Sequence, residues 1–347
     1  MSVVLTRSRF TNALRCYWNY ALSRFGLVRI SHMPMFVSVE PAAICQLRCP
    51  ECPVGQAKTA ALTDRFTDRP ATPDRVQTEL PLMPREVWER TLSEVRETAW
   101  VMQFYFQGEP LLNKDLPQMI SEAHKAGLYT IVSTNAQALT EEMAQALVAA
   151  GLDRIIVSMD GLTEESYGAY RIGGSLEQCK KALRYLHKAK SVCTLSMKRS
   201  VLCQQSGLTI ELQVLRLKTN EHEWAEMKRV YKSLGADRLV FKTAQLYDYA
   251  DGHPLMPSDP RYSRYIQGKD GKYHRRQLRK GCFRVWSGCV ITTNGDVLPC
   301  CYDKAHVHAY GNNKESAIGE LFRNAISLAF RKAAIHEQPD ICKECWK

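Results

Sequence analysis

Three cysteines early in the chain have a spacing that suits an iron–sulfur cluster. Cys45, Cys49 and Cys52 follow one another as C-x3-C-x2-C, directly after a short apolar stretch. A cubic iron–sulfur cluster takes one thiolate on each iron, so four cysteines would saturate it. Three thiolates on one tight loop leave one iron open to bind another molecule. A structural zinc site would instead need four ligands, usually from two CxxC-type pairs.

A second group of cysteines lies near the end of the chain. The protein has 13 cysteines, an odd number that argues against a disulfide framework in a chain without a secretion signal. In a reducing compartment, grouped cysteines usually hold metal. The members of the second group are Cys282, Cys289, Cys300, Cys301, Cys342 and Cys345.

The composition is that of a globular protein. Of its 347 residues, 45% are hydrophobic and 24% are charged, which excludes wholesale disorder. No apolar run approaches the ~18–20 residues of a membrane span, and no signal peptide is visible, so we expect a cytoplasmic location. The net charge of +11 indicates acidic partners, without choosing among nucleic acid, anionic lipid and a phosphorylated substrate.

Strand and helix patterns alternate along most of the chain. Helical patterns separate the strands, and alternation of this kind implies a parallel sheet with right-handed crossovers. Near-continuous apolar strands imply a sheet that is covered on both faces or closed into a barrel. Six units suit an open barrel, so the predicted fold is α/β, a partial (β/α)6 TIM-like barrel with a small C-terminal α+β domain. The expected strands are 35–40, 101–107, 129–134, 154–159, 209–217 and 238–243, and the expected helices are 85–98, 115–126, 140–150, 175–190 and 222–234.

The domain boundaries follow from changes in composition. Residues 1–32 are predicted to form an N-terminal amphipathic helix, residues 33–250 the barrel and residues 282–347 the C-terminal domain. Between them, residues 251–281 are polar and basic with interleaved tyrosines, which we interpret as a solvated linker.

The N-terminal helix has an apolar stripe. Phe10, Leu14, Trp18, Leu22 and Phe25 recur at helical spacing among several arginines. Such stripes usually pack against the body of the protein, and we expect the same here. The alternative is peripheral contact of residues 1–30 with an anionic membrane surface.

The first cysteine group resembles the cluster motif of the radical S-adenosylmethionine (SAM) enzymes. The loop Ile44–Cys52 matches that motif, and the turn Gln107-Gly108-Glu109-Pro110 resembles the family's GGEP turn, which meets the amino group of SAM. Two departures stand out. Glu51 replaces the aromatic residue that usually precedes the third cysteine, and Gln107 replaces the first glycine of the turn.

Other strand ends carry polar residues that fit the same resemblance. In the family, residues at these places contact the SAM ribose, and an arginine binds the SAM carboxylate in a bidentate way. The resemblance implies that SAM is held by Gln107, Gly108, Glu109, Pro110, Ser133, Asn135, Ser158, Asp160 and Arg171, on a cluster bound by Cys45, Cys49 and Cys52.

The C-terminal cysteines resemble the SPASM/twitch domain of the same enzymes. Residues 290–298 predict a β-hairpin with an Asn-Gly turn. The segment Gly295–Cys300 and the terminal CxxC are the closest matches. The resemblance implies one auxiliary 4Fe-4S cluster on Cys282, Cys300, Cys342 and Cys345. Cys301 is an alternative to Cys300, Cys289 could be a buried thiol, and a zinc ion could occupy the four thiolates instead.

The resemblance implies a reaction class. The reduced SAM-binding 4Fe-4S cluster would cleave SAM to a 5′-deoxyadenosyl radical, which abstracts a hydrogen atom from the substrate. The outcome would be oxidation or modification of a peptide or of a sugar or polyol, with an electron donor such as flavodoxin or ferredoxin. The sequence identifies no catalytic side chain. Two other classes stay open. One is a zinc-binding, nucleic-acid-binding protein that uses both cysteine groups, and the other is a peripheral membrane scaffold. Nucleic acid is not an expected partner of the enzyme.

Overall fold

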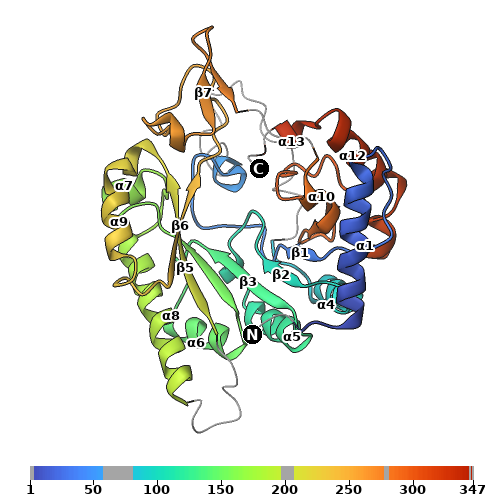
Figure 1. Ribbon diagram of the computed structural model, residues 1–347. Coiled ribbons are helices and arrows are strands. Elements are labelled where there is room, and N and C mark those ends of the chain that lie inside the picture. The colour runs from blue at the N-terminus through green and yellow to red at the C-terminus, as the bar shows by residue number, and fades with distance from the viewer. Residues whose placement is uncertain (1–3, 58–80, 197–206, 277–280, 344, 346–347) are drawn as a thin grey trace. The chain divides into compact units, whose positions relative to one another are not determined.

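The chain forms two compact units. The computed structural model describes residues 4–57, 81–196, 207–276, 281–343 and 345, without the side chains of 193–196. The first unit comprises Met1–Ile44, Thr72–Ile131 and Leu278–Lys347, and the second comprises Cys45–Ala71 and Val132–Gln277. The strands follow the order β10-β9-β1-β2-β3-β4-β5-β6 (Figure 1). The residues of β3 (Tyr129–Thr134) are divided between the units.

The strands of the first unit join distant parts of the sequence. β1 (Phe36–Val39) pairs in parallel with both β2 (Val101–Phe104) and β9 (Gly288–Ile291). The predicted hairpin is confirmed, because β10 (Val297–Leu298) pairs antiparallel with β9. Gly295 takes the positive φ of +92° that its turn requires. The helices of this unit are α1 (Arg7–Ser23), α4 (Arg85–Val95), η1 (Pro110–Leu112), α5 (Leu116–Lys125), α10 (Phe283–Ser287), α11 (Ile318–Leu321), α12 (Ala325–His336) and α13 (Asp340–Lys343).

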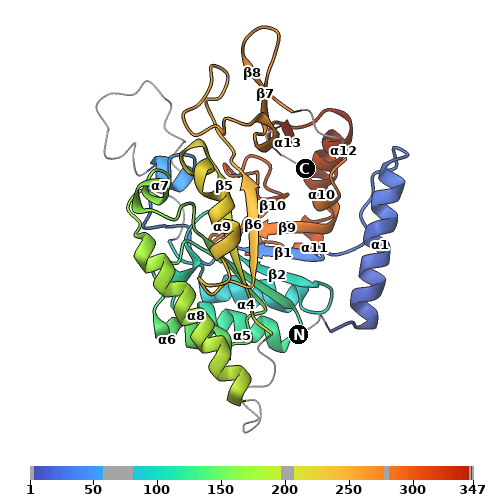
Figure 2. The ribbon, with the colours of Figure 1, turned by 60° about the vertical axis from the view of Figure 1, so that its left-hand side comes forward.

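The second unit continues the βα alternation. β4 (Arg154–Ser158) pairs in parallel with β5 (Thr209–Arg216), and β5 pairs in parallel with β6 (Arg238–Thr243). Both ribbon views show α6 and α8 running side by side (Figures 1 and 2). The helices of this unit are α6 (Glu141–Ala149), α7 (Glu164–Gly168), α8 (Leu176–Ser196), η3 (Lys218–Glu223), α9 (Trp224–Val230) and η4 (Pro260–Tyr262).

The six predicted strands and the five predicted helical segments are confirmed. Thr140 and Thr163 cap α6 and α7, since their hydroxyls accept from the N–H groups of Met143 (3.1 Å) and Ser166 (3.2 Å). The fold is therefore α/β, a partial barrel of six βα units followed by a C-terminal domain.

The basic stretch 251–281 contains secondary structure. Its strands β7 (Tyr265–Gln267) and β8 (Tyr273–Arg275) form an antiparallel pair. Tyr265 is buried, and its hydroxyl accepts from Leu246 N–H at 2.7 Å and donates to Leu246 O at 2.8 Å. Residues 277–280 of this stretch lie outside the described residues.

Helix α1 packs on the first unit, but not through the predicted stripe. Its buried face is mostly polar, and the large apolar side chains of the stripe are exposed, apart from half-buried Leu22. The buried Arg9 guanidinium donates to the carbonyl oxygens of Arg96 (2.8 Å), Ala126 (2.6 Å) and Gly127 (2.9 Å). Carbonyls at the ends of α4 and α5 need such donors, so the arginine takes the inward position and the apolar stripe faces outward.

His32 links α1 to the C-terminal part of the first unit. Asn19 Nδ2 donates to His32 Nδ1 at 2.9 Å, so the ring proton is on Nε2, which donates to Trp286 O at 2.9 Å. Burial lowers the pKa of His32 from 6.5 to about 4; nearby Arg331 and Arg323 also lower it, and the bond to Trp286 opposes the change.

This environment predicts an acid-sensitive packing of α1. The unfolded chain binds a proton at His32 below pH 6.5, whereas the folded chain does so only near pH 4, so stability falls as the pH drops through this window. At about 1.4 kcal/mol per pH unit, the loss is about 3 kcal/mol. Urea unfolding measured between pH 6.5 and pH 4 should show this loss of unfolding free energy. In the His32→Gln variant, the unfolding free energy should depend less on pH over the same range. An unchanged dependence in the variant would contradict the assignment.

No helix in the described part of the chain combines the length and the apolar character needed to cross a bilayer.

Candidate active site

The first cysteine group lies on a loop of the second unit that is fixed by main-chain hydrogen bonds. Arg48 N–H donates to Ile172 O at 3.0 Å, and Cys52 N–H donates to Cys49 O at 3.2 Å. These bonds hold the backbone of the loop against the segment after α7. Leu47 is buried beside Cys49 in an apolar cluster, so the loop has an apolar underside.

The sulfur of Cys45 receives two hydrogen bonds. The donors are Leu47 N–H at 3.4 Å and Asn135 Nδ2 at 3.3 Å. Gln46 Nε2 in turn donates to Asn135 Oδ1 at 3.1 Å, so the amide is oriented by the same loop. Hydrogen bonds to cluster ligands tune the reduction potential. Asn135, predicted from the resemblance to contact SAM, thus lies against Cys45, a predicted cluster ligand.

Cys49 is buried beside a charged pair. Arg171 Nη1 lies 3.9 Å from Cys49 Sγ, and Arg171 Nε donates to Asp160 Oδ2 at 2.6 Å. Burial raises the pKa of the Cys49 thiol, and the Arg171 guanidinium opposes that change. Asp160 Oδ1 accepts from Leu215 N–H at 2.6 Å, so both carboxylate oxygens are engaged. The Asp160 carboxylate therefore fixes the arginine beside the thiol.

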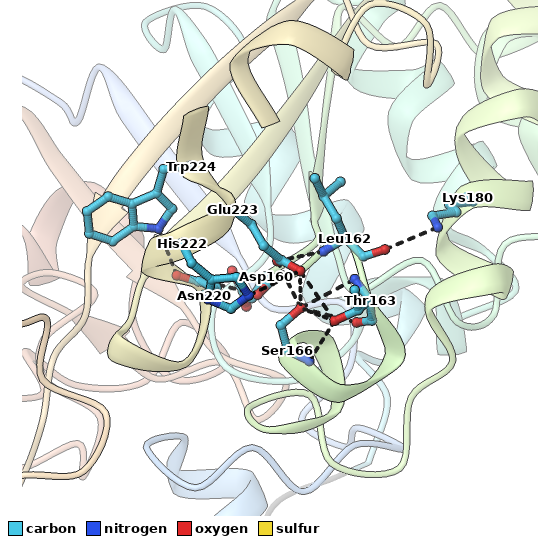
Figure 3. Close-up of polar contacts among 9 residues, drawn as sticks. All are labelled: Asp160, Leu162, Thr163, Ser166, Lys180, Asn220, His222, Glu223 and Trp224. Atoms are coloured by element: carbon cyan, nitrogen blue, oxygen red, sulfur yellow. Dashed lines mark hydrogen bonds and ion pairs between the residues drawn. The ribbon is translucent and has the colours of Figure 1, made fainter. Parts of the chain in front are cut away.

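A polar network anchors the loop that carries Asp160 (Figure 3). Asn220 Nδ2 donates to Asp160 O at 2.8 Å, and Trp224 Nε1 donates to Asn220 Oδ1 at 2.8 Å. The buried Glu223 carboxylate accepts from Leu162 N–H at 2.9 Å and from Ser166 Oγ at 2.8 Å. The segment after β5 thereby fixes the segment after β4.

Glu51 occupies the position where the family usually has an aromatic residue. Its Oε2 accepts from Tyr247 N–H at 2.8 Å, and its Oε1 lies 3.4 Å from His253 Nε2. The side chain therefore ties the cysteine loop to the chain that follows β6. An aromatic ring could not make these two polar contacts.

The turn at Gln107–Pro110 belongs to the first unit. Glu109 is buried, and its N–H donates at 2.8 Å to the carbonyl of Ile44, the residue before Cys45. A Cβ atom on Gly108 would lie 2.0 Å from Ala42 O, so only glycine fits this turn. Gln107 Nε2 donates to Lys304 O at 3.1 Å. The turn thus packs on the strand end that leads into the cysteine loop.

Two other predicted SAM contacts lie at strand ends of the second unit. Ser133 is half-buried in β3, and Ser158 is buried at the end of β4, where its carbonyl lies 3.9 Å from the Cys179 thiol. The structure describes no polar contact of either hydroxyl.

The structure brings the C-terminal cysteines together within the first unit. Burial raises the pKa of the Cys300 thiol, and the neighbouring thiols of Cys301, Cys342 and Cys345 act in the same direction. Burial raises the pKa of Cys342 to about 11, with Cys282 and Cys345 acting in the same direction.

Two further cysteines differ from this group. Cys289 is buried in β9, as expected for a structural thiol. Cys301 accepts a hydrogen bond from Arg284 Nη1 at 3.5 Å, which gives it a partner other than the other thiols. Cys45 also accepts hydrogen bonds, so this contact does not distinguish Cys301 from Cys300 as a ligand. Cys282, Cys300, Cys342 and Cys345 stay the predicted ligand set, with Cys301 as the alternative to Cys300.

Both donor sets fit cubic clusters. Thiolates are the ligands that such clusters take, and each sulfur binds a different iron. The ligands of a cubic cluster therefore do not have to converge on a single metal ion. Within the described ranges, no group of three or more His, Cys, Asp or Glu side chains is arranged to hold one ion. The three-thiol loop stays the predicted site of a cluster with an open iron, and the C-terminal set stays the predicted site of a saturated one.

Several residues that shape the site escaped the sequence analysis. Gln46, Asn220 and Glu223 act through partners far away in the chain. Polar residues next to a motif or at a strand end are too common to single out without the fold.

Comparison with protein families defines the class. Residues 39–197 match the model of the radical SAM superfamily, and residues 282–346 match that of an iron–sulfur cluster-binding domain, SPASM. The protein is a radical SAM enzyme with a C-terminal SPASM domain, and its cofactors are 4Fe-4S clusters and SAM. These matches give no support to the zinc-binding, nucleic-acid-binding alternative.

The chain is also similar to individual proteins of this kind. It is 27% identical over 334 residues to the PqqA peptide cyclase of Gluconobacter oxydans, covering 90% of this chain and 82% of the relative. It is also 27% identical over 227 residues to the PqqA peptide cyclase of Granulibacter bethesdensis. That alignment covers 65% of this chain and 52% of the relative. The fold is similar to Streptococcus suis SuiB bound to precursor peptide SuiA, with a TM-score of 0.58 at 14% identity over 92% of this chain and 71% of SuiB.

Proposed function

We propose that this enzyme modifies a peptide by abstracting a hydrogen atom from it. The observation that carries the proposal is the three-thiol loop, with Asn135 on Cys45 and Arg171 beside Cys49. When bound there, the cluster supplies an electron that cleaves SAM and generates the hydrogen-abstracting radical. The peptide substrate is supported by relatives named PqqA peptide cyclase and by the similarity to a peptide-bound enzyme.

The residues of the chain have separate roles in this proposal. Cys45, Cys49 and Cys52 bind the cluster, and Asn135 and Arg171 adjust the environment of its sulfurs. The turn Gln107–Pro110 binds the amino group of SAM, as the resemblance implies. We also propose SAM contacts at Ser133, Asn135, Ser158, Asp160 and Arg171. The proposed domains are the helical segment 1–32, the barrel 33–250, the linker 251–281 and the C-terminal domain 282–347. The proposed electron donor is a flavodoxin or ferredoxin.

Isotope transfer tests the substrate class. The reconstituted enzyme is incubated without oxygen with reductant, SAM and a pool of perdeuterated peptides, and separately with a pool of deuterated sugars and polyols. Hydrogen abstraction from a peptide predicts deuterium in 5′-deoxyadenosine with the peptide pool alone. Deuterium transfer from the sugar and polyol pool alone would contradict the peptide proposal and leave the enzyme class intact.

The auxiliary cysteines are expected to act after hydrogen abstraction. Cys342→Ala should lower the iron content by about four per chain, the content of one cubic cluster. It should retain part of the 5′-deoxyadenosine formation while product formation stops. Cys289→Ala is the matched control, because this buried thiol lies in β9, and it should retain all the iron. Full product formation by the Cys342 variant would contradict this role.

A further inference from the structure

The outer face of α1 exposes large apolar side chains. Leu14 is 54% exposed and Trp18 is 60% exposed, although a helix of a globular protein normally turns such residues inward. Figure 2 shows α1 at the outer edge of its unit. The exposed apolar side chains of this face, including those just beyond the helix end, are Phe10, Leu14, Tyr17, Trp18, Phe25 and Leu27.

The helix is attached to its unit mainly through polar groups on the opposite face. Besides Arg9, Asn12 exchanges two hydrogen bonds with the main chain of Met33, at 3.0 and 2.8 Å. Asn19 Nδ2 donates to Ser31 Oγ at 2.9 Å. Tyr17 contributes to this attachment, because its ring stacks on Phe283. The other outward apolar residues do not hold α1 in place. Their exposure calls for a partner outside the unit.

The charge around this face has one sign. The sequence contains no Asp or Glu before Glu40. Four exposed arginines flank or follow the apolar residues, namely Arg7, Arg15, Arg24 and Arg29. Arginines at the border of an apolar face can extend their guanidinium groups to phosphates while their methylene stems stay in apolar surroundings. The electrostatic complement of this face is an anionic surface.

We propose that the outer face of α1 binds the surface of an anionic phospholipid bilayer. The helix would lie in the plane of the interface, with Trp18 at the headgroup level, where such rings are favoured. With 17 residues and no spanning character, it fits an interfacial position. A second copy of the chain fits less well, because two such faces would bring their arginines together without a single acidic residue to pair with them.

Vesicle cosedimentation of the full-length holoenzyme tests the proposal. The probes are vesicles of phosphatidylcholine mixed with phosphatidylglycerol and vesicles of phosphatidylcholine alone. We expect binding to the anionic vesicles that weakens as salt is added. The double variant Leu14→Ser/Trp18→Ser should lower the fraction bound by about tenfold or more, since it removes two large buried contacts with the acyl boundary.

Matched controls distinguish binding through the outer face of α1 from a general effect of changing exposed apolar or charged side chains. Ile326→Ser changes a side chain of α12 that is 55% exposed, close to the 54% of Leu14, and this variant should bind like the unaltered protein. Arg7→Gln/Arg15→Gln should weaken binding to anionic vesicles, whereas Lys114→Gln/Lys125→Gln, which removes the same charge elsewhere, should not. Circular dichroism and iron content show that the variants are folded.

Three results would overturn the proposal. The first is the absence of binding to anionic vesicles, and the second is undiminished binding by Leu14→Ser/Trp18→Ser. The third is a dimer in gel filtration that dissociates in this variant, which would assign the face to a second copy of the chain. None of these results bears on hydrogen abstraction, because the experiment contains no substrate.

Discussion

Replacing Cys45, Cys49 or Cys52 by Ala is expected to reduce 5′-deoxyadenosine formation to the level seen without enzyme. Each substitution removes one of the three thiolates that we propose to hold the SAM-binding cluster, and two thiolates on one loop cannot fix a cube. The variants should also lose about four irons per chain, the content of one cubic cluster. Iron analysis and chromatography of the reaction mixture, both under anaerobic conditions, provide the measurement.

A buried cysteine of the same unit serves as the control. Cys179 lies in α8, and burial raises the pKa of its thiol to about 12, so it is a protonated structural thiol. Cys179→Ala should retain the iron and the SAM cleavage of the unaltered enzyme. SAM cleavage that persists in any of the three loop variants would refute the assignment of the loop.

Replacing Arg171 by Leu is expected to cost about 3–5 kcal/mol of folding free energy, the usual cost of leaving a buried charge without its partner. Asp160 has no exposed side-chain surface, and its bond to Arg171 is 2.6 Å long. The variant should also lower SAM cleavage by about 10–100-fold, as loss of a group beside a metal ligand typically does. Thermal unfolding and 5′-deoxyadenosine formation measure the two effects separately.

A double variant separates the two roles of Arg171. Asp160→Asn/Arg171→Leu removes both charges but keeps an amide oxygen that can accept from Leu215 N–H. Because no unpaired charge remains, most of the lost stability should return, whereas SAM cleavage should stay low. Recovery of both properties would show that Arg171 contributes only to the stability of the fold. A stable single variant would contradict the inferred ion pair.

Local patterns were sufficient to predict most of the elements. The strand patterns at 209–217 and 238–243 depend on neighbours within a few residues, and the structure confirms both strands. The parallel pairing of β9 with β1 was not predictable in this way. It joins Val37 to Cys289, and no local signal specifies a partner so far away in the chain.

The orientation of α1 shows another limit of periodicity. The pattern correctly predicts a helix with an apolar stripe, but it does not say which side faces the protein. That choice depends on Arg9, whose guanidinium satisfies carbonyls at Arg96 and Gly127 that the helical pattern does not reveal. The prediction that the stripe packs on the body is therefore wrong.

In the candidate site, too, features with a local sequence signal could be predicted, whereas contacts between distant residues could not. The cysteines were found because their spacing is local and chemically distinctive. Asn135 was singled out as a polar strand end, but its hydrogen bond to Cys45 follows only from the fold. The network of Asn220 and Glu223 gave no sequence signal, because both residues act on a segment about sixty positions earlier.

Anaerobic reconstitution of the unaltered protein, followed by iron analysis and a SAM cleavage assay with a chemical reductant, tests the central claim most directly. Two cubic clusters predict on the order of eight irons per chain. The account also predicts 5′-deoxyadenosine that forms only when both reductant and SAM are present. A protein that takes up no iron under these conditions and leaves SAM intact would contradict it.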